Sequence, residues 1–170
     1  MARVLYDLTA SQDRRFSPFC WRTKLALAHK GLEITSQPVR FTDISGLSDG
    51  PRLTLPTLVD GDQRITDSWA IALHLEAAYP DHQALFPTGQ EVARFVQGWT
   101  NTTLHLPLLR IALLTVYNAL DTENQAYFRE NREARFGTTL EAFVEDRPAA
   151  LSGFRRALQP IRDVLADQPY

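Results

Sequence analysis

The order of the predicted elements in the first eighty residues is the feature that most constrains the fold. Arg3–Leu8 is a short run of β-forming residues, and a helix pattern begins near Ser17 after a polar loop. A second strand pattern at Glu33–Val39 completes a strand–helix–strand unit. Such a unit places its two strands in parallel with a right-handed connection between them. An α/β layer is therefore predicted at the start of the chain.

The first predicted helix has clear signals at both ends. Ser17 is a preferred N-cap residue, and Pro18 suits the first helical position, where no N–H donor is needed. Gly31 favours the left-handed conformation that ends many helices. Apolar residues at helical spacing predict the side of the helix that faces the core, and these are Trp21, Leu25, Ala28 and Leu32.

A hairpin and a second helix are predicted further along. Residues 40–52 are rich in turn-forming residues and indicate at most one helical turn. The stretch LPTLVDGDQRIT then holds two short strand patterns around an Asp60-Gly61 turn. Asp67 and Ser68 open a helix that ends at Pro80, with its apolar side formed by Ile71, Ala72, Leu75 and Tyr79.

The composition changes after residue 80. Residues 81–90 contain proline and lack periodicity, which predicts a linker. The later helices are predicted at residues 91–120 with a bend at Pro107, at 122–136 behind a Thr122–Gln125 capping box, and within 138–167. We therefore predict an α/β domain over 1–80 and an all-α domain over 91–170.

Composition also excludes several classes of function. The net charge of −2 gives no reason to expect a nucleic acid or an anionic membrane as a partner. The single cysteine excludes an internal disulfide and a cysteine-based metal cluster, and the four histidines lack ligand-like spacing, so no metal is expected. No apolar stretch is long enough for a membrane span or a signal region, which predicts a soluble cytoplasmic protein.

Several residues of the first half are candidates for chemistry. Ser17 places a hydroxyl at the positive end of a helix, and Cys20 lies one turn further on. Asp67 and Ser68 stand at another helix N-terminus, which suits a carboxylate ligand. Each also has a purely structural explanation, as a helix cap or, for Cys20, as buried packing.

Leu55-Pro56 directly precedes a predicted strand, where proline donates no ladder hydrogen bond. A cis peptide bond at a turn would explain this position and leave the Leu55 backbone open to an extended ligand. A trans proline at the start of a strand is equally compatible with the sequence.

Taken together, the motifs resemble the cytosolic glutathione transferases, which combine a thioredoxin-like domain with an all-helical domain. The resemblance is carried by SPFCWRTKLALAHKG and LPTLVDGDQRITDSWAIALHLEAAYP, and it extends over essentially the whole chain. SPFCWRTKLALAHKG and QAYFRENREARFGTTLEAF are most similar to the bacterial β-etherase-like group. The given sequence ends with DVLADQPY, whereas members of the family usually continue with further helices at this point. An incomplete C-terminal domain is therefore expected.

The resemblance implies a role for each candidate residue. Ser17 corresponds to the catalytic residue and Pro56 to the cis-proline of the family, with the Leu55 backbone bound to the cysteinyl part of glutathione. Asp67 and Ser68 correspond to the pair that holds the γ-glutamyl carboxylate. Some classes instead use a tyrosine near the position of Tyr6, but the Ser-Pro-Phe opening belongs to the serine and cysteine classes.

One position departs from the family pattern. Several serine-type members have a lysine just before the cis-proline, which reaches the glycine carboxylate of glutathione, whereas this chain has Leu53 and Thr54. Arg40 and Arg52 are the candidates to replace that contact. The pocket for the second substrate is expected between the loop TASQDRR and the long helix, lined by Trp99, Leu104, Leu108 and Arg110.

The resemblance therefore predicts an enzyme that adds glutathione, its co-substrate, to an apolar or aromatic electrophile, including cleavage of an aryl ether. A homodimer is also expected from the family. Two other functions remain open: thiol–disulfide exchange through Cys20, as in glutaredoxins, and a non-catalytic binding module on the same fold.

Overall fold

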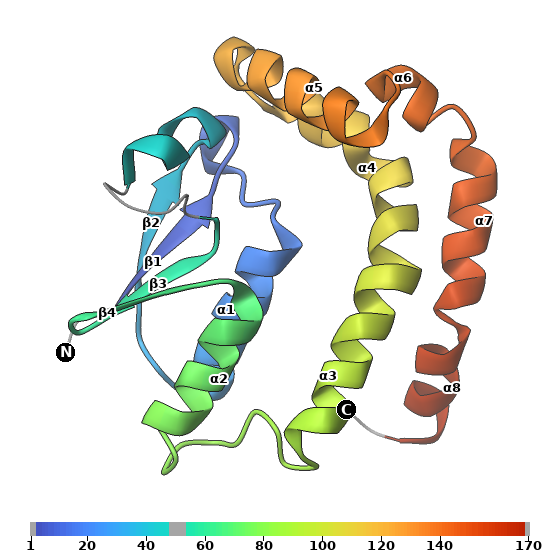
Figure 1. Ribbon diagram of the computed structural model, residues 1–170. Helices are drawn as coiled ribbons and strands as arrows, with labels where there is room; N and C mark the ends of the chain where they lie inside the picture. Colours follow the sequence, from blue (N-terminus) through green and yellow to red (C-terminus); the bar gives the residue numbers. More distant parts are fainter. Residues whose placement is uncertain (1–2, 48–53, 169–170) are drawn as a thin grey trace. The chain divides into compact units, whose positions relative to one another are not determined.

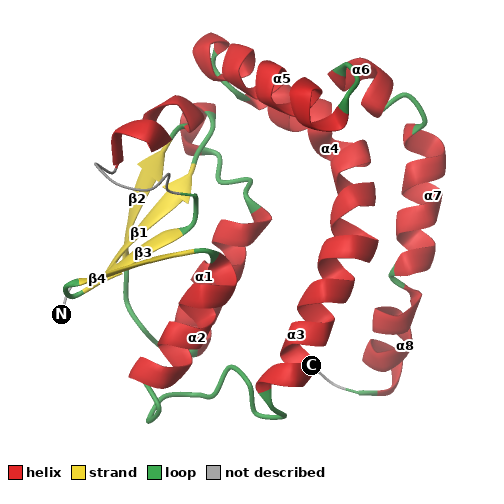
Figure 2. Ribbon diagram, viewed as in Figure 1, coloured by secondary structure: helices red, strands yellow, loops and turns green. Residues whose placement is uncertain are grey.

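The computed structural model describes residues 3–47 and 54–168. Packing divides the chain into two compact units. The first comprises Met1–Pro87 with Ala119–Phe128, and the second comprises Thr88–Asn118 with Arg129–Tyr170. Within the described residues, the strands all belong to the first unit and the second is built from helices alone (Figures 1 and 2). The predicted combination of an α/β thioredoxin-like part and an all-α part is confirmed.

The first unit is built on a four-stranded sheet with the strand order β2-β1-β3-β4. Its strands are β1 (Arg3–Leu8), β2 (Thr35–Val39), β3 (Thr57–Asp60) and β4 (Gln63–Thr66). β1 and β2 run parallel, as the strand–helix–strand pattern predicts. β3 pairs antiparallel with both β1 and β4, and Gly61 occupies the β3–β4 turn with a φ of +59°. The predicted hairpin is thus confirmed.

Two helices pack against one face of this sheet. They are α1 (Pro18–His29) and α2 (Ser68–Ala78), and they begin and end where the capping signals predict. A cluster of buried side chains from β1, β3, both helices and the connection after α1 joins these layers, and its members are Leu5, Leu27, Leu32, Leu58, Ile71 and Leu75. Because burial of each such side chain contributes about 1.5–3 kcal/mol, this cluster fixes both helices to the sheet.

The predicted core-facing side of α1 is wrong for Trp21, Leu25 and Ala28, which are exposed, whereas Leu32 just after the helix is buried as predicted. Trp21 and Leu25 are 46% and 63% exposed, whereas the residues of α1 that are buried are Cys20, Thr23 and Leu27. The apolar spacing marked the wrong side because two of the buried positions hold a cysteine and a threonine rather than large aliphatic residues. Polar groups near the start of α1 therefore face inward, toward β1.

The segment after β2 contains more helix than predicted. The 3-10 helix η2 covers Phe41–Leu47, which exceeds the single turn expected for residues 40–52. Phe41 lies 5.9 Å from the ring of Tyr127 and 5.6 Å from that of Phe128, and the Thr42 N–H donates to Asn124 Oδ1. These contacts explain why residues 119–128 belong to the first unit. The same contacts hold Phe41 and Thr42, the first residues of η2, in place and so stabilise this helical segment.

Seven helical segments follow the connection after α2. They are α3 (Gln90–Trp99), the π-helical segment η3 (Thr100–His105), α4 (Leu106–Ala119), α5 (Thr122–Phe136), α6 (Leu140–Phe143), α7 (Arg147–Ala157) and α8 (Gln159–Asp167). The sequence predicted one helix over 91–120 bent at Pro107, but the irregularity precedes the proline as the π-helical segment. Proline lacks the N–H for the regular helical bond, and π-helical geometry is one way to accommodate that loss.

Residue 121 rather than 122 caps α5. Asp121 Oδ1 accepts from the backbone N–H of Asn124 at 3.0 Å, which corrects the predicted Thr122–Gln125 capping box. Gly137 ends α5 with a φ of +67°, as predicted. Within the second unit, Leu113, Leu140 and Phe143 are buried, and the rings of Phe136 and Phe143 stack at 4.1 Å.

Candidate active site

Ser17 occupies the N-cap of α1, as the sequence predicts. Its Oγ accepts a hydrogen bond from the Cys20 backbone N–H at 3.3 Å, and Pro18 fills the first helical position. The side chain is largely enclosed, with 6% of the residue exposed. A helix N-terminus carries a partial positive charge and unpaired N–H groups. The Ser17 hydroxyl therefore lies where a negative charge is favoured.

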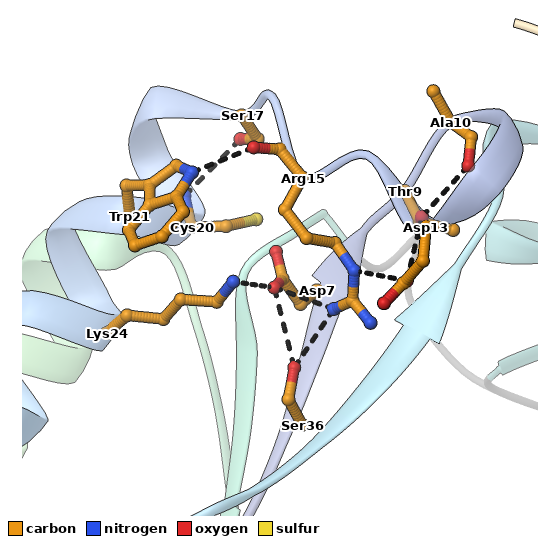
Figure 3. A network of polar contacts seen from close by, with 10 residues as sticks. All are labelled: Asp7, Thr9, Ala10, Asp13, Arg15, Ser17, Cys20, Trp21, Lys24 and Ser36. Carbon is orange, nitrogen blue, oxygen red and sulfur yellow. Dashed lines mark hydrogen bonds and ion pairs between the residues drawn. The ribbon is translucent and has the colours of Figure 1, made fainter.

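The loop before Ser17 is anchored through Arg15 (Figure 3). Arg15 Nη1 donates to Asp7 Oδ2 at 2.8 Å, and Arg15 Nε donates to Asp13 Oδ1 at 2.6 Å. The Trp21 indole N–H donates to the Arg15 carbonyl at 2.8 Å. The residue two positions before Ser17 is thus held to β1 by its side chain and to α1 by its backbone.

Asp7 is the acid at the centre of these contacts, and the sequence analysis did not select it. It is fully buried on β1, and its Oδ2 also forms an ion pair with Lys24 of α1 and accepts from Ser36 Oγ at 3.4 Å. Its other oxygen, Oδ1, has no hydrogen-bond partner. The available signal was an acid near the end of the strand RVLYDL, on the same face as the core residue Leu5.

Cys20 is fully buried one turn into α1. Burial is the main cause that raises the pKa of its thiol to about 11, and the charge of Asp7 acts in the same direction. The Leu8 backbone N–H and the Ser17 hydroxyl act against the shift without cancelling it. At neutral pH the thiol therefore keeps its proton.

The segment at Pro56 contains the cis peptide bond that the resemblance implies. Leu55-Pro56 is cis, Leu55 is half-buried and Pro56 is buried. The Pro56 carbonyl accepts from the Asp67 backbone N–H at 3.2 Å. Two of the predicted glutathione contacts, the proline turn and the start of α2, are therefore adjacent in the structure.

Asp67 caps α2 in an unusual backbone conformation. Its φ is +82°, and its Oδ1 accepts from the N–H groups of Trp69 and Ala70 at 2.9 and 3.1 Å. Positive φ values are uncommon for aspartate and concentrate at functional sites. Burial lowers the pKa of Arg22 on α1, while the Asp67 charge opposes that shift. Asp67 at the start of α2 therefore interacts electrostatically with Arg22 of α1.

The accessory candidates differ in their surroundings. Tyr6 lies on the opposite face of β1 from Asp7, because successive strand residues alternate between faces. The Arg40 guanidinium forms two hydrogen bonds to Asp43, at 2.9 and 3.0 Å. Arg52 lies outside the described residues.

The four residues predicted to line the electrophile pocket all belong to the second unit. They are Trp99 in α3, Leu104 in η3, and Leu108 and Arg110 in α4. The Arg110 guanidinium lies 4.8 Å from the centre of the Phe143 ring, so it packs against α6. The loop expected to complete the pocket belongs to the first unit, and the pocket stays a prediction.

The described part of the chain contains no group of three or more metal-ligating side chains. Within the same residues, every helix is too short or too polar to cross a bilayer.

Two family profiles together match most of the chain. The profile "Glutathione S-transferase, N-terminal domain" matches residues 16–78, and "Glutathione S-transferase, C-terminal domain" matches residues 92–169. The chain belongs to the glutathione S-transferase family. The N-terminal match contains Ser17, Pro56, Asp67 and Ser68, which are the residues singled out from the sequence.

Individual glutathione S-transferases match to different extents. Glutathione S-transferase Z1 of Arabidopsis thaliana is 40% identical over 65 residues, which cover 35% of this chain and 29% of the plant protein. The zeta-class glutathione S-transferase of Euphorbia esula is 39% identical over 71 residues, covering 38% and 31%. The matched segment thus spans between 29% and 31% of the length of these relatives.

Two solved fungal structures match over nearly the whole chain. Glutathione transferase GSTFuA3 from Phanerochaete chrysosporium gives a TM-score of 0.85 at 26% identity, covering 99% of this chain and 74% of the fungal one. CsGST63524 of Ceriporiopsis subvermispora, solved in complex with glutathione, gives 0.83 at 27% identity, covering 100% and 76%.

Proposed function

We propose that this chain carries a glutathione transferase site in which the Ser17 hydroxyl stabilises the thiolate of bound glutathione. The observation that carries the proposal is the place of Ser17 at the N-cap of α1, at the positive end of the helix dipole. Family membership supports it, as does the fungal neighbour that was solved with glutathione.

The chemistry of this site is thiolate stabilisation rather than proton abstraction. A free thiol with a pKa of about 8.5 is only slightly ionised at neutral pH, and the thiolate is the nucleophile. A serine hydroxyl holds its own proton at pH 7 but can donate it in a hydrogen bond to sulfur. One charge-assisted bond of about 1.5–3 kcal/mol corresponds to one to two pKa units, since each unit requires about 1.36 kcal/mol.

The rest of glutathione would be held by the proline turn and the start of α2. In this proposal the Leu55 backbone pairs with the cysteinyl part, and Asp67 and Ser68 receive the γ-glutamyl group. The contact between the Pro56 carbonyl and the Asp67 N–H supports this assignment, because it keeps the two predicted contacts adjacent. Arg40 is a weaker candidate for the glycine carboxylate, since Asp43 already occupies its guanidinium.

The proposed second substrate is an apolar or aromatic electrophile. In the etherase-like form of the reaction, the thiolate attacks the carbon that bears an aryl ether. A C–S bond forms, the C–O bond breaks, and the aryloxide leaves and takes a proton from water. The motif resemblance supports this form, and Trp99, Leu104, Leu108 and Arg110 remain the proposed lining of the pocket.

The thiol–disulfide alternative is disfavoured by the state of Cys20. A nucleophilic cysteine requires exposure and a lowered pKa, whereas Cys20 is buried with a pKa of about 11. A non-catalytic module would bind glutathione without turnover, which the experiment below distinguishes. Pairing of two copies is part of the proposal and is measured by the mass of the protein in solution.

The proposal is tested with Ser17→Ala and, as a matched control, Ser45→Ala at an exposed position. We expect Ser17→Ala to bind glutathione normally but to lower kcat/KM with chlorodinitrobenzene about 10- to 100-fold at pH 6.5, corresponding to one to two pKa units. The loss should shrink as the pH rises above the pKa of free glutathione. Unchanged turnover in Ser17→Ala would remove Ser17 from the mechanism, and binding without turnover in the unmodified protein would favour a binding module.

The aryl-ether form needs a separate substrate comparison. Release of phenol from a β-aryl ether, with formation of the glutathione thioether, supports etherase chemistry. Conjugation of chlorodinitrobenzene without any phenol release contradicts it.

A further inference from the structure

The two carboxylate oxygens of Asp7 differ in the number of polar contacts that they make. Its Oδ2 contacts Arg15, Lys24 and Ser36, whereas its Oδ1 has no hydrogen-bond partner although Asp7 is fully buried. In Figure 3, the Asp7 oxygen that carries no dashed line, Oδ1, points toward the Cys20 sulfur. An unpaired buried carboxylate oxygen is costly. The S–H proton of Cys20 is a donor that lies in the direction of this oxygen.

Cys20 also lies close to the site proposed for glutathione. The Ser17 hydroxyl that would face the glutathione sulfur is one of the groups acting on the Cys20 thiol. Two sulfur atoms would therefore lie near the same end of α1, although that of Cys20 is fully buried. If Cys20 were ionised, it could attack glutathione disulfide: the S–S bond breaks, a Cys20–glutathione mixed disulfide forms, and one glutathione thiolate leaves.

We propose that the Asp7 carboxylate adds to burial in keeping the Cys20 sulfur protonated, and that it thereby disfavours disulfide exchange at a site that serves the glutathione thiolate. Asp7 touches no substrate in this proposal, so it is a positioning and specificity residue rather than a catalytic one. The inference rests on the proposed function, because glutathione must reach the start of α1.

The charges around this pair determine the sign of the expected effects. Arg15 approaches from the preceding loop, Lys24 from α1, and Asp13 lies on the far side of Arg15. The contact from β2 is the neutral Ser36 hydroxyl. Replacing Asp7 by Asn removes a negative charge and leaves two cations nearby, which should lower the pKa of Cys20 below about 11, while burial still acts to raise it.

The first test follows the ionisation of Cys20 directly and requires no glutathione. Because the sequence contains a single cysteine, protein labelled with ¹³C at cysteine Cβ gives one resonance whose shift reports the thiolate. We expect Asp7→Asn to lower the titration midpoint measurably, because one of the two causes that raise it is removed. Asp13→Asn, which removes an exposed acid from the same Arg15, should leave the midpoint unchanged.

A second variant separates charge from loosened structure. Lys24→Gln removes a cation near the same carboxylate, so the midpoint should rise or stay where it is. Loosened packing would instead lower the midpoint in both variants. An unchanged midpoint in folded Asp7→Asn overturns the proposal. Should Asp7→Asn fail to fold, a lowered midpoint in Lys24→Gln overturns it equally.

The second test uses glutathione disulfide at pH 8.5, with mass spectrometry to detect one added glutathionyl group. A lowered pKa raises the thiolate fraction more than it lowers the nucleophilicity of each thiolate, because the Brønsted coefficient is only about 0.4–0.5, so mixed disulfide should form faster. We expect this gain in Asp7→Asn and in neither Lys24→Gln nor Asp13→Asn. A lowered midpoint without mixed disulfide in any variant would overturn the restriction of disulfide exchange by Asp7, while leaving its effect on the Cys20 thiol in place.

Discussion

Two acids of the same sheet, the buried Asp7 and the partly buried Asp60, illustrate different uses of a carboxylate. Asp60 pairs in register with Arg3 at the start of β1, and both of its oxygens are bound. The Tyr79 hydroxyl lies 2.8 and 2.7 Å from them, and His74 Nε2 lies 2.9 Å from Oδ2. Asp7, near the other end of β1, leaves one oxygen without a partner.

The difference separates a structural network from a candidate functional one. A fully bonded, partly buried acid orders the residues around it, here β1, β3 and α2, and no further ligand is needed to explain it. An incompletely bonded buried acid violates a rule that folded proteins rarely break, and such violations concentrate at functional sites. Asp60 is therefore expected to affect stability, and Asp7 to affect the reactivity of its neighbour.

The largest expected effect is that of Asp60→Ala on stability. The substitution removes the shared partner of Tyr79 and His74 from a nearly enclosed site, and breaking such a network costs about 3–5 kcal/mol. Urea unfolding measures the loss, with Asp62→Ala in the exposed turn as a control expected within about 0.5 kcal/mol of the unmodified protein. A loss below about 1 kcal/mol would remove the contrast with Asp7.

A smaller effect is expected from deleting one hydroxyl of the Asp60 network. Tyr79→Phe removes the donor to Asp60 and the acceptor for Arg3 Nε at 2.9 Å, and should cost about 1–2 kcal/mol in urea unfolding. Tyr6→Phe is the matched change on β1 and should leave both stability and glutathione conjugation near their starting values. If Tyr6→Phe instead abolishes conjugation, the sulfur hydrogen-bond donor is Tyr6 rather than Ser17.

The smallest effect concerns acid stability. Burial acts to raise the pKa of Asp60, but the hydrogen bonds from Tyr79 and His74 and the charge of Arg3 outweigh it, leaving the pKa below its ordinary 3.8. The ionised carboxylate thus stabilises the fold fully above pH 3.8, and this contribution is lost as the pH falls through the lower folded value. The stability difference between the unmodified protein and Asp60→Asn should shrink below pH 3.8 in urea unfolding. A constant difference between pH 5 and 2.5 would contradict this.

Local signals in the sequence were enough to locate the starts of α1 and α2 and the β3–β4 turn. Ser17 with Pro18, Asp67 before α2, and the Asp60-Gly61 turn act through their own backbone neighbours, so their effects are visible in a short stretch of sequence. For the same reason the candidate residues at helix N-termini could be selected before the structure was known.

Contacts between distant residues could not be predicted in this way. Asp7, Arg15 and Lys24 meet only because the strand–loop–helix path folds back on itself, and nothing in their spacing marks an ion cluster. The inward side of α1 was misassigned because hydrophobic spacing gives no weight to a buried threonine or to a cysteine next to an acid. The π-helical segment before Pro107 also has no local signature beyond the proline itself.

The packing of Phe41 against Tyr127 and Phe128 has a consequence for biosynthesis. A ribosome that has released the sheet and α2 has not yet made the aromatic side chains that cover η2. Residues 88–128 must first be synthesised, which takes about 2–8 s at about 5–20 residues per second. During that interval the nascent N-terminal half exposes an aromatic surface, and this surface is where a chaperone would have most reason to bind.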